Sequence, residues 1–225
     1  MQRFLRDIGI FSVFACLMAL MLPTAAAAHP HVWVKVETEV IYNEQKAITG
    51  FRHKWDFDEY YSAFAVQGLD KNGDGKYDRA ELAELAEVNV SSLKDFGYFT
   101  FPKIAGKLVE RNKPIDYWLE YSDGILTLKL TVPLKDPIAA EGTKDLVFGV
   151  FDPTFYVDFA FVPKDPVRLS HAPSGCAPSV KDPDPQAQQG GGVSTLGEAY
   201  FNDIGTDPSI AEGYAKSVRI VCAAG

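Results

Sequence analysis

The sequence predicts a mainly β protein of the α+β class, built as an antiparallel β-sandwich with a helix-loop-helix inserted between its early strands. Apolar and polar residues alternate from residue 32 to residue 40, the period of a strand with one buried face. Later apolar runs are short and are separated by turns rich in Gly, Pro, Asp and Ser. Helical spacing of apolar residues lies mainly between residues 58 and 96. About eight strands with short connections favour a sandwich.

Each element follows from its local pattern. Residues 47–55 form the hairpin partner of the first strand, and residues 58–69 and 82–93 form the two inserted helices. Asp56 or Asp58 is expected to cap the first helix. Asp152 is expected in a turn before an aromatic strand, with a ligand role as the alternative. Further strands are expected at residues 98–104, 107–111, 116–121, 125–134, 145–151 and 154–162, and a short helix precedes a closing strand at residues 217–222.

Length and composition limit the class of protein. The chain has 225 residues, 47% of them hydrophobic, which excludes a disordered chain. Its 22 Lys and Arg against 30 Asp and Glu give a net charge of -8. An acidic chain without a basic run argues against nucleic acid and anionic lipid as partners. We expect one sandwich-like domain over residues 29–225, with the helical insertion at about 58–96.

The N-terminus has the pattern of a secretory signal peptide, residues 1–28. Two arginines precede an apolar run at residues 8–22, and small residues follow, with cleavage after Ala27 or Ala28. A membrane anchor is the weaker alternative, because a spanning helix needs roughly 20 apolar residues. We therefore expect a periplasmic protein without a membrane span after cleavage. In that oxidising compartment Cys176 and Cys222 are expected to pair, and residues 173–192 read as a mobile Pro/Gly/Gln loop.

The strongest chemical motif is DKNGDGKYDRAE, between the two predicted helices. It matches the calcium-loop pattern of an EF-hand at every specified position, and its glycine permits the sharp turn. Calcium prefers six to eight hard oxygens. The expected ligands are Asp70, Asn72, Asp74, the main-chain carbonyl of Lys76, Asp78 through a water, and Glu81 with both oxygens.

The alternative is an acidic turn with no bound ion, but four crowded carboxylates repel each other without a cation. Magnesium fits less well because it demands tighter octahedral geometry. Tyr77 stands where an aliphatic residue usually contacts a sister loop, and the sequence shows no second loop. We therefore expect a structural ion bound with a Kd on the order of 10⁻⁴ to 10⁻³ M.

Histidines near the expected new N-terminus predict a second kind of metal site. His29 and His31 are two residues apart, so in an extended segment both rings project to one side. Imidazole suits zinc, nickel or copper rather than calcium. His53 is the expected third ligand, and His171 is a weaker candidate. The alternative is a pair of solvated histidines at a frayed end.

No enzyme is expected, because the sequence has no GxSxG elbow and no glycine-rich phosphate loop. An enzyme with an N-terminal copper centre is a weak third reading, supported by the histidines alone.

Four segments together resemble one known family. They are HPHVW, GFRHKWDFDEYYSAFAVQGLDKNGDG, YFTF and FDPTFYVDF, spread over most of residues 29–162. The chain is similar in these to the domain of unknown function 1007 family. The resemblance implies a periplasmic component of an ABC-type transport system, often encoded beside nickel/cobalt-type transporters and in some cases linked to zinc acquisition. It implies a transition-metal role for His29 and His31, whereas the calcium loop rests on its own residues.

The leading hypothesis is a periplasmic accessory protein that captures zinc or nickel/cobalt for an inner-membrane transporter, with calcium stabilising the insertion. The alternative is a calcium-stabilised binding module with no role in metal transport. The transition metal, the partner and the oligomeric state stay open.

Overall fold

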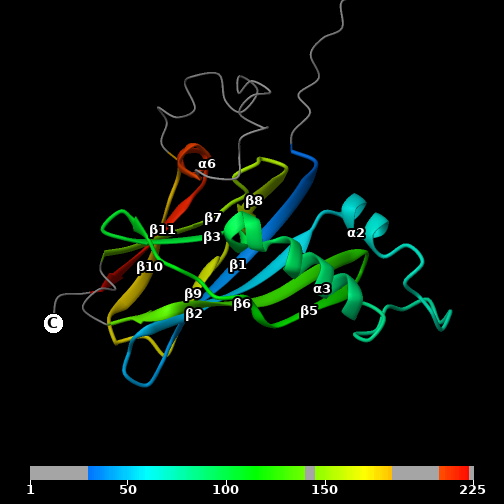
Figure 1. Ribbon diagram of the computed structural model, residues 1–225, viewed down its shortest axis with the longest axis horizontal. Helices are drawn as coiled ribbons and strands as arrows, with labels where there is room; N and C mark the ends of the chain where they lie inside the picture. Colours follow the sequence, from blue (N-terminus) through cyan, green and yellow to red (C-terminus); the bar gives the residue numbers. More distant parts are fainter. Residues whose placement is uncertain (1–29, 140–144, 184–207, 223–225) are drawn as a thin grey trace, which may run out of the picture.

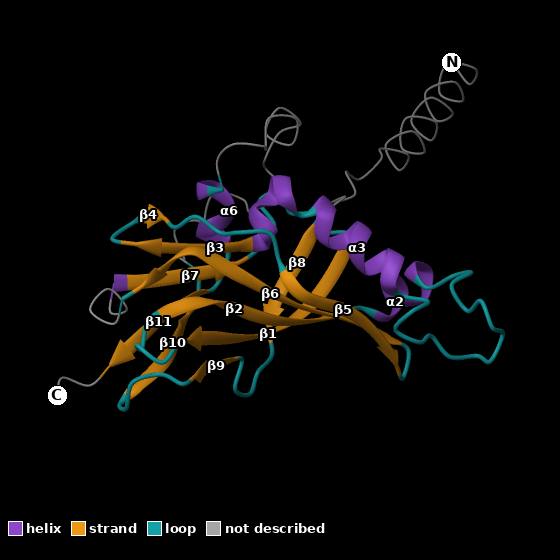
Figure 2. Ribbon diagram, turned by 60° about the horizontal axis from the view of Figure 1, so that its bottom comes forward, coloured by secondary structure: helices purple, strands orange, loops and turns teal. Residues whose placement is uncertain are grey.

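Two β-sheets and a few short helices make up this mainly β protein (Figure 1). The computed structural model describes residues 30–139, 145–183 and 208–222. The strands of the two sheets lie in two layers, and the helices gather toward one side of them (Figure 2). In chain order the elements are β1 (Val32–Tyr42), β2 (Ile48–Phe57), α2 (Glu59–Ala65), α3 (Ala83–Ser92), the 3-10 helix η1 (Lys94–Phe99), β3 (Thr100–Ile104), β4 (Lys107–Leu108), β5 (Ile115–Ser122), β6 (Ile125–Ile138), β7 (Leu146–Val150), β8 (Val157–Phe161), β9 (Val167–Ser170), β10 (Cys176–Lys181), α6 (Ser209–Tyr214) and β11 (Ser217–Cys222).

The first sheet is mixed and the second is antiparallel. The first has the order β5-β6-β2-β1-β8, with β9 also paired to β1, and the second has the order β10-β11-β7-β3-β4. The prediction of an antiparallel sandwich is therefore wrong for the first sheet, because β8 and β9 run parallel to β1. Parallel neighbours need a long connection, and the chain builds much of the second sheet before it returns to β1.

Buried and exposed residues alternate along β1 and β2, and the buried ones form part of the core between the two sheets. The predicted hairpin of these strands is confirmed. The two strands pair in an antiparallel register that sets Val36 opposite Trp55, and both side chains are buried. Phe51 of β2 meets Phe148 of β7 across the gap between the sheets, with ring centroids 4.7 Å apart. Side chains from both sheets belong to one continuous cluster of buried residues.

The helical insertion lies between β2 and β3, as predicted, but its first helix is shorter than expected. It ends at Ala65 rather than at residue 69. Gly68, with a φ of 75°, continues into a turn in which the Leu69 amide bonds the Val66 carbonyl. A positive φ suits glycine and ends helical geometry, which accounts for the early stop.

The predicted loop at residues 173–192 is wrong over its first half. Cys176–Lys181 forms β10, an edge strand that pairs with the correctly predicted closing strand β11. Pro178 misled the prediction, because proline is tolerated on an edge strand although it marks loops elsewhere. The rest of that loop, from residue 184, and the predicted signal peptide lie outside the described residues. Within the described ranges, no helix has the length and apolar character needed to cross a membrane.

Candidate metal centre

The acidic loop is held between two anchored helices. Asp58 caps α2 through its Oδ1, which accepts the amides of Tyr60 and Tyr61 at 3.0 Å. Buried Ser62 fixes α2 to the first sheet, because its Oγ accepts the Leu126 amide of β6 at 2.9 Å. On the other side of the loop, Ala86 and Val90 of α3 are buried in the core cluster that both sheets share, and Glu87 adds an exposed ion pair with Lys113 at 3.3 Å. Both ends of the loop are therefore fixed to the first sheet or to the segment leading into it.

The oxygen-bearing side chains of the loop are turned toward its own backbone. Asp70 Oδ1 accepts the Gly73 amide at 2.8 Å, and its Oδ2 accepts the Gly75 amide at 3.0 Å. Asn72 Oδ1 accepts the amide of Asp74, whose own Oδ1 accepts the Lys76 amide, both at 2.8 Å. These bonds keep the side chains at loop positions 1, 3 and 5 on the inner side of a tight turn.

Glu81 closes the loop at its twelfth position. Its Oε1 accepts the Lys71 amide at 2.8 Å, and its Oε2 accepts the Asp78 amide at 3.0 Å. Asp78 returns a bond, since its Oδ1 accepts the Glu81 amide at 2.9 Å. The Glu81 residue is 7% exposed, which is unusual for a glutamate without a basic partner. A buried carboxylate therefore lies against the start of the loop.

Aromatic contacts attach the loop to β5, and sequence reasoning missed them. The ring of Tyr77 lies edge-on to that of Tyr121, with centroids 4.9 Å apart. The guanidinium of Arg79 lies 4.3 Å from the centre of the Trp118 ring. Tyr77 thus packs against the sheet, where a sister loop would lie in a paired arrangement. The aromatic pattern DYWLEY in the predicted strand was the available signal.

The loop side chains do not converge on one point as the ligands of a bound cation would. Nowhere in the described part of the chain do three His, Cys, Asp or Glu side chains come close enough together to hold a metal ion. Several of the loop carboxylates point at separate backbone amides. The α2 helix has seven residues, so the insertion has the order helix, loop, helix without the two long helices of an EF-hand.

The histidines predicted to share a transition metal are not brought together. His29 lies outside the described residues. His31 is exposed just before β1, and its ring centroid lies 4.9 Å from that of Tyr156. His53 is paired with Thr38, seven residues further along β1, which places it roughly 23 Å from His31 at about 3.3 Å per residue. His171 follows β9, which pairs with the far end of β1. The expectation that His53 completes a site with His31 does not fit this geometry.

His53 instead has a place in the core. It is 1% exposed, and its Nδ1 and Nε2 lie 3.0 Å and 3.1 Å from the hydroxyls of Thr38 and Thr100. Burial lowers the pKa of His53 to about 3, so the ring is neutral at physiological pH. With both nitrogens engaged, the ring has no lone pair left for a metal.

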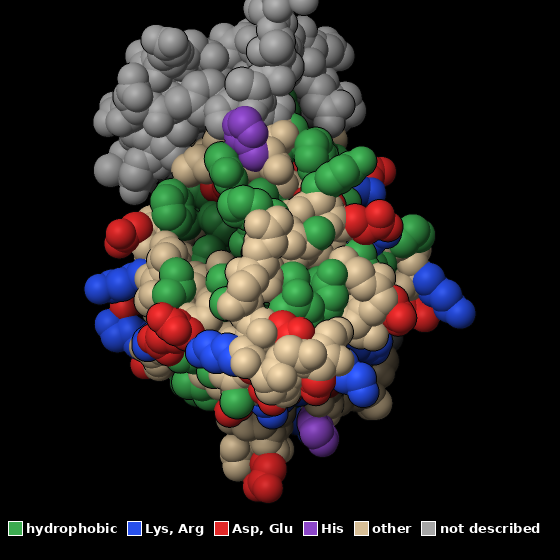
Figure 3. Space-filling model, turned by 90° about the vertical axis from the view of Figure 1, so that its right-hand side faces the viewer, with side chains coloured by type: hydrophobic (Ala, Val, Ile, Leu, Met, Phe, Trp, Pro, Cys, Tyr) green, Lys and Arg blue, Asp and Glu red, His purple; other side chains and the backbone are tan. Residues whose placement is uncertain are grey.

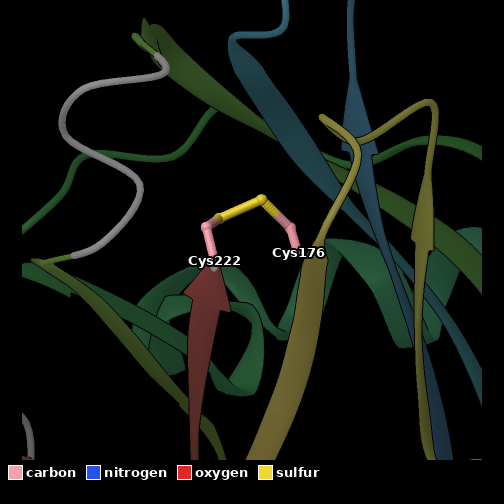
Figure 4. The surroundings of a disulfide bond; sticks show 2 residues. All are labelled: Cys176 and Cys222. Atoms are coloured by element: carbon pink, nitrogen blue, oxygen red, sulfur yellow. A yellow bond between two sulfur atoms is a disulfide. The ribbon is translucent and has the colours of Figure 1, made fainter. Parts of the chain in front are cut away.

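Cys176 and Cys222 form the expected disulfide. The bond joins facing residues of β10 and β11, near the end of the chain (Figure 4). Asp152 has the expected turn role, because its carboxylate accepts the amides of Thr154 at 2.7 Å and Val157 at 2.9 Å.

These features define a two-sheet, mainly β protein that is closed by a disulfide and carries an acidic loop on a helical insertion. The chain belongs to the family described as "Protein of unknown function (DUF1007)", whose model matches residues 14–222. It is similar to an uncharacterized protein of Haemophilus influenzae, with 24% identity over 209 residues that cover 93% of this chain and 98% of that protein. It is also similar to an uncharacterized 15.5 kDa protein of Spirochaeta aurantia, with 31% identity over 110 residues that cover 49% of this chain and 77% of the relative.

Proposed function

We propose that this protein is an exported binding module whose helical insertion is stabilised by one calcium ion in the loop from Asp70 to Glu81. The buried carboxylate of Glu81 is the observation that carries the proposal, because it belongs to an acidic loop and its hydrogen bonds with the described residues are all to backbone amides of that loop. A desolvated carboxylate in an acidic loop is stabilised by a bound cation. Oxygens at positions 1, 3, 5, 7, 9 and 12 suit calcium.

The residues that would hold the ion are those of the sequence pattern. Their present bonds to amides are compatible with this, since each carboxylate oxygen has more than one acceptor direction. The ion would supply positive charge to the loop and hold its two ends together. The ligands would be Asp70, Asn72, Asp74, the carbonyl of Lys76, Asp78 and Glu81.

Export is supported by two independent features. Residues 1–28 have the pattern of a secretory signal peptide. Disulfides such as Cys176–Cys222 persist in oxidising compartments, of which the bacterial periplasm is one. An extracellular-type calcium affinity in the high micromolar to millimolar range fits the same location.

Calorimetry with calcium chloride tests the proposal. We expect one calcium per chain, and we expect Glu81→Gln to abolish the binding. Glu84→Gln removes the same charge from an exposed position in the first turn of α3 and serves as the matched control. Absence of binding up to 10 mM calcium in the parent protein would reject the proposal.

A second candidate function is delivery of zinc or nickel/cobalt to an inner-membrane transporter. One observation favours it: His31 is exposed just before β1, and in the sequence His29 lies two residues earlier, separated from it by Pro30. His53 is not part of this candidate site. The candidate requires that His29→Ala with His31→Ala removes zinc binding while calcium binding is kept. Unchanged zinc affinity in that double variant would exclude it.

A further inference from the structure

A cavity of about 470 Å³ lies where the start of β1, the edge strand β8 and helix α6 meet. Small-molecule sites usually have about 300–1,000 Å³ and mostly apolar walls. Aromatic rings from three separate parts of the chain supply those walls here. They belong to Trp33, Phe151, Phe155, Phe159 and Tyr214. Figure 3 shows hydrophobic side chains gathered around a hollow on one face of the molecule.

Several contacts hold these walls in place. Phe151 stacks on Phe101 of β3, with ring centroids 4.3 Å apart. Phe155 meets Tyr214 of α6 edge-on at 5.6 Å, and an ion pair between Lys103 and Glu212 attaches α6 to the second sheet. The wall is therefore fixed to the scaffold and does not depend on the calcium loop.

The backbone at Phe155 is strained. Its φ is 58°, a left-handed conformation that costs a bulky residue about 1–3 kcal/mol. The amides of Thr154 and Val157, on either side of this residue, both donate to the Asp152 carboxylate and hold the turn in this shape. Strained residues cluster at ligand-binding sites, and Phe155 lies in the wall of the cavity.

One carboxylate gives the cavity its charge preference. Asp158 of β8 lines the cavity, and its carboxylate takes part in no hydrogen bond or ion pair with the described residues. Although the residue is exposed, partial desolvation raises the pKa of its carboxyl. Lys216, on the same wall, is paired with Asp182 at 2.8 Å. The unpaired charge is therefore negative.

A neighbouring hollow of about 530 Å³ strengthens the same field. It shares Trp33 and Asp158 with the cavity, so the two adjoin. Its other charged lining residues are Asp56, which is paired with Lys54 at 2.9 Å, and Asp58 and Glu59 against Lys35. Carboxylates lining a low-dielectric hollow concentrate cations near its mouth.

We propose that the cavity binds a small organic cation, with its ammonium group next to Asp158 and its apolar body against the faces of Trp33, Phe155 and Tyr214. Aromatic faces attract ammonium groups through their quadrupole, and the carboxylate adds a direct charge pair. The site goes beyond calcium binding and is independent of it.

Matched probes test the proposal on the full exported chain in 1 mM calcium. Benzylammonium, benzyl alcohol and benzoate share one ring and differ in charge. Calorimetry should give benzylammonium a Kd at least about tenfold below that of benzoate, with benzyl alcohol between them. Asp158→Asn should weaken benzylammonium about tenfold and leave benzyl alcohol unchanged, because the amide keeps the shape and removes the charge.

Asp136→Asn is the control, since it removes one exposed carboxylate of β6 outside the lining of the cavity. Trp33→Ala should weaken all three probes, because its ring forms part of the wall. Circular dichroism melting curves check that each variant is folded. Equal affinities for benzylammonium and benzoate, or no binding of any probe at 10 mM, would overturn the proposal.

Discussion

His53 of β2 and Thr100 of β3 are joined by a buried hydrogen bond of 3.1 Å that connects the two sheets. The Thr100 hydroxyl donates its single hydrogen to the Tyr98 carbonyl, at 2.8 Å. Thr100 Oγ1 therefore accepts from His53 Nε2–H. Because a neutral imidazole carries one hydrogen, Nδ1 must accept, and Thr38 donates to it at 3.0 Å.

This arrangement predicts a single tautomer. His53 should carry its proton on Nε2 throughout the pH range in which the protein is folded. Long-range ¹⁵N–¹H correlation spectra distinguish the two tautomers and imidazolium. We expect the Nε2–H pattern for His53 to stay unchanged from pH 8 to pH 5. An Nδ1–H pattern would contradict the assigned direction of both threonine bonds.

Protonation of the same ring predicts loss of stability in acid. The folded-state pKa of His53 is about 3 and the unfolded value is 6.5, so the unfolded chain binds the extra proton between these values. The His53 contribution is complete above about pH 6.5 and falls by roughly 1.4 kcal/mol per pH unit below it.

Urea unfolding of the parent and of His53→Gln, from pH 7.5 to pH 4, isolates this contribution. The variant should be less stable at pH 7.5, and the difference from the parent should shrink as the pH falls. His171→Gln, which removes an exposed histidine outside the core, serves as the control. A constant difference between parent and His53→Gln across the range would refute the prediction.

Sequence patterns predicted the strands and helices whose apolar residues repeat with a clear period. Val36 and Val40 alternate with charged residues, and that alternation alone defines β1 and its buried face. Parallel pairing of β8 with β1 has no local signal, because an edge strand shows the same alternation for either direction. The segment Cys176–Lys181 contains a proline, and its apolar and polar residues alternate only weakly. It is therefore recognised as a strand only from its pairing with β11.

The candidate sites also differ in how far local sequence could predict them. The spacing of the loop residues from Asp70 to Glu81 follows from local sequence, so sequence could propose it. The role of His53 depends on Thr38 and on Thr100 of the opposite sheet, which no pattern around His53 reveals. The cavity depends on residues as distant as Trp33 and Tyr214, which only the fold brings together.

Reduction of Cys176–Cys222 should destabilise the protein. The cysteines are 46 residues apart in sequence. Closing a loop of that size lowers the entropy of the unfolded chain, which raises the free energy of unfolding by about 2–4 kcal/mol. Unfolding in urea with and without dithiothreitol measures the difference. Cys176→Ser with Cys222→Ser should reproduce the reduced protein and be insensitive to dithiothreitol. Equal stability of the oxidised and reduced chains would show that the bond adds nothing to folding.

Packing of Tyr77 against Tyr121 should raise the calcium affinity of the loop, although Tyr121 supplies no ligand. The contact holds the eighth loop position on β5, so part of the cost of ordering the loop is met before the ion binds. An aromatic pair contributes about 0.5–1.5 kcal/mol, so Tyr121→Ala should raise the calcium Kd roughly two- to tenfold.

Tyr60→Ala provides the matched control for this last prediction, because Tyr60 is an aromatic residue of α2 that is 89% exposed and should leave the Kd unchanged. In the double variant Tyr77→Ala with Tyr121→Ala, the second change should add little to the first, since both remove one contact. Additive losses would show that the two rings act separately. If the parent binds calcium and Tyr121→Ala binds it equally well, the sheet does not support the loop, while calcium binding itself stands.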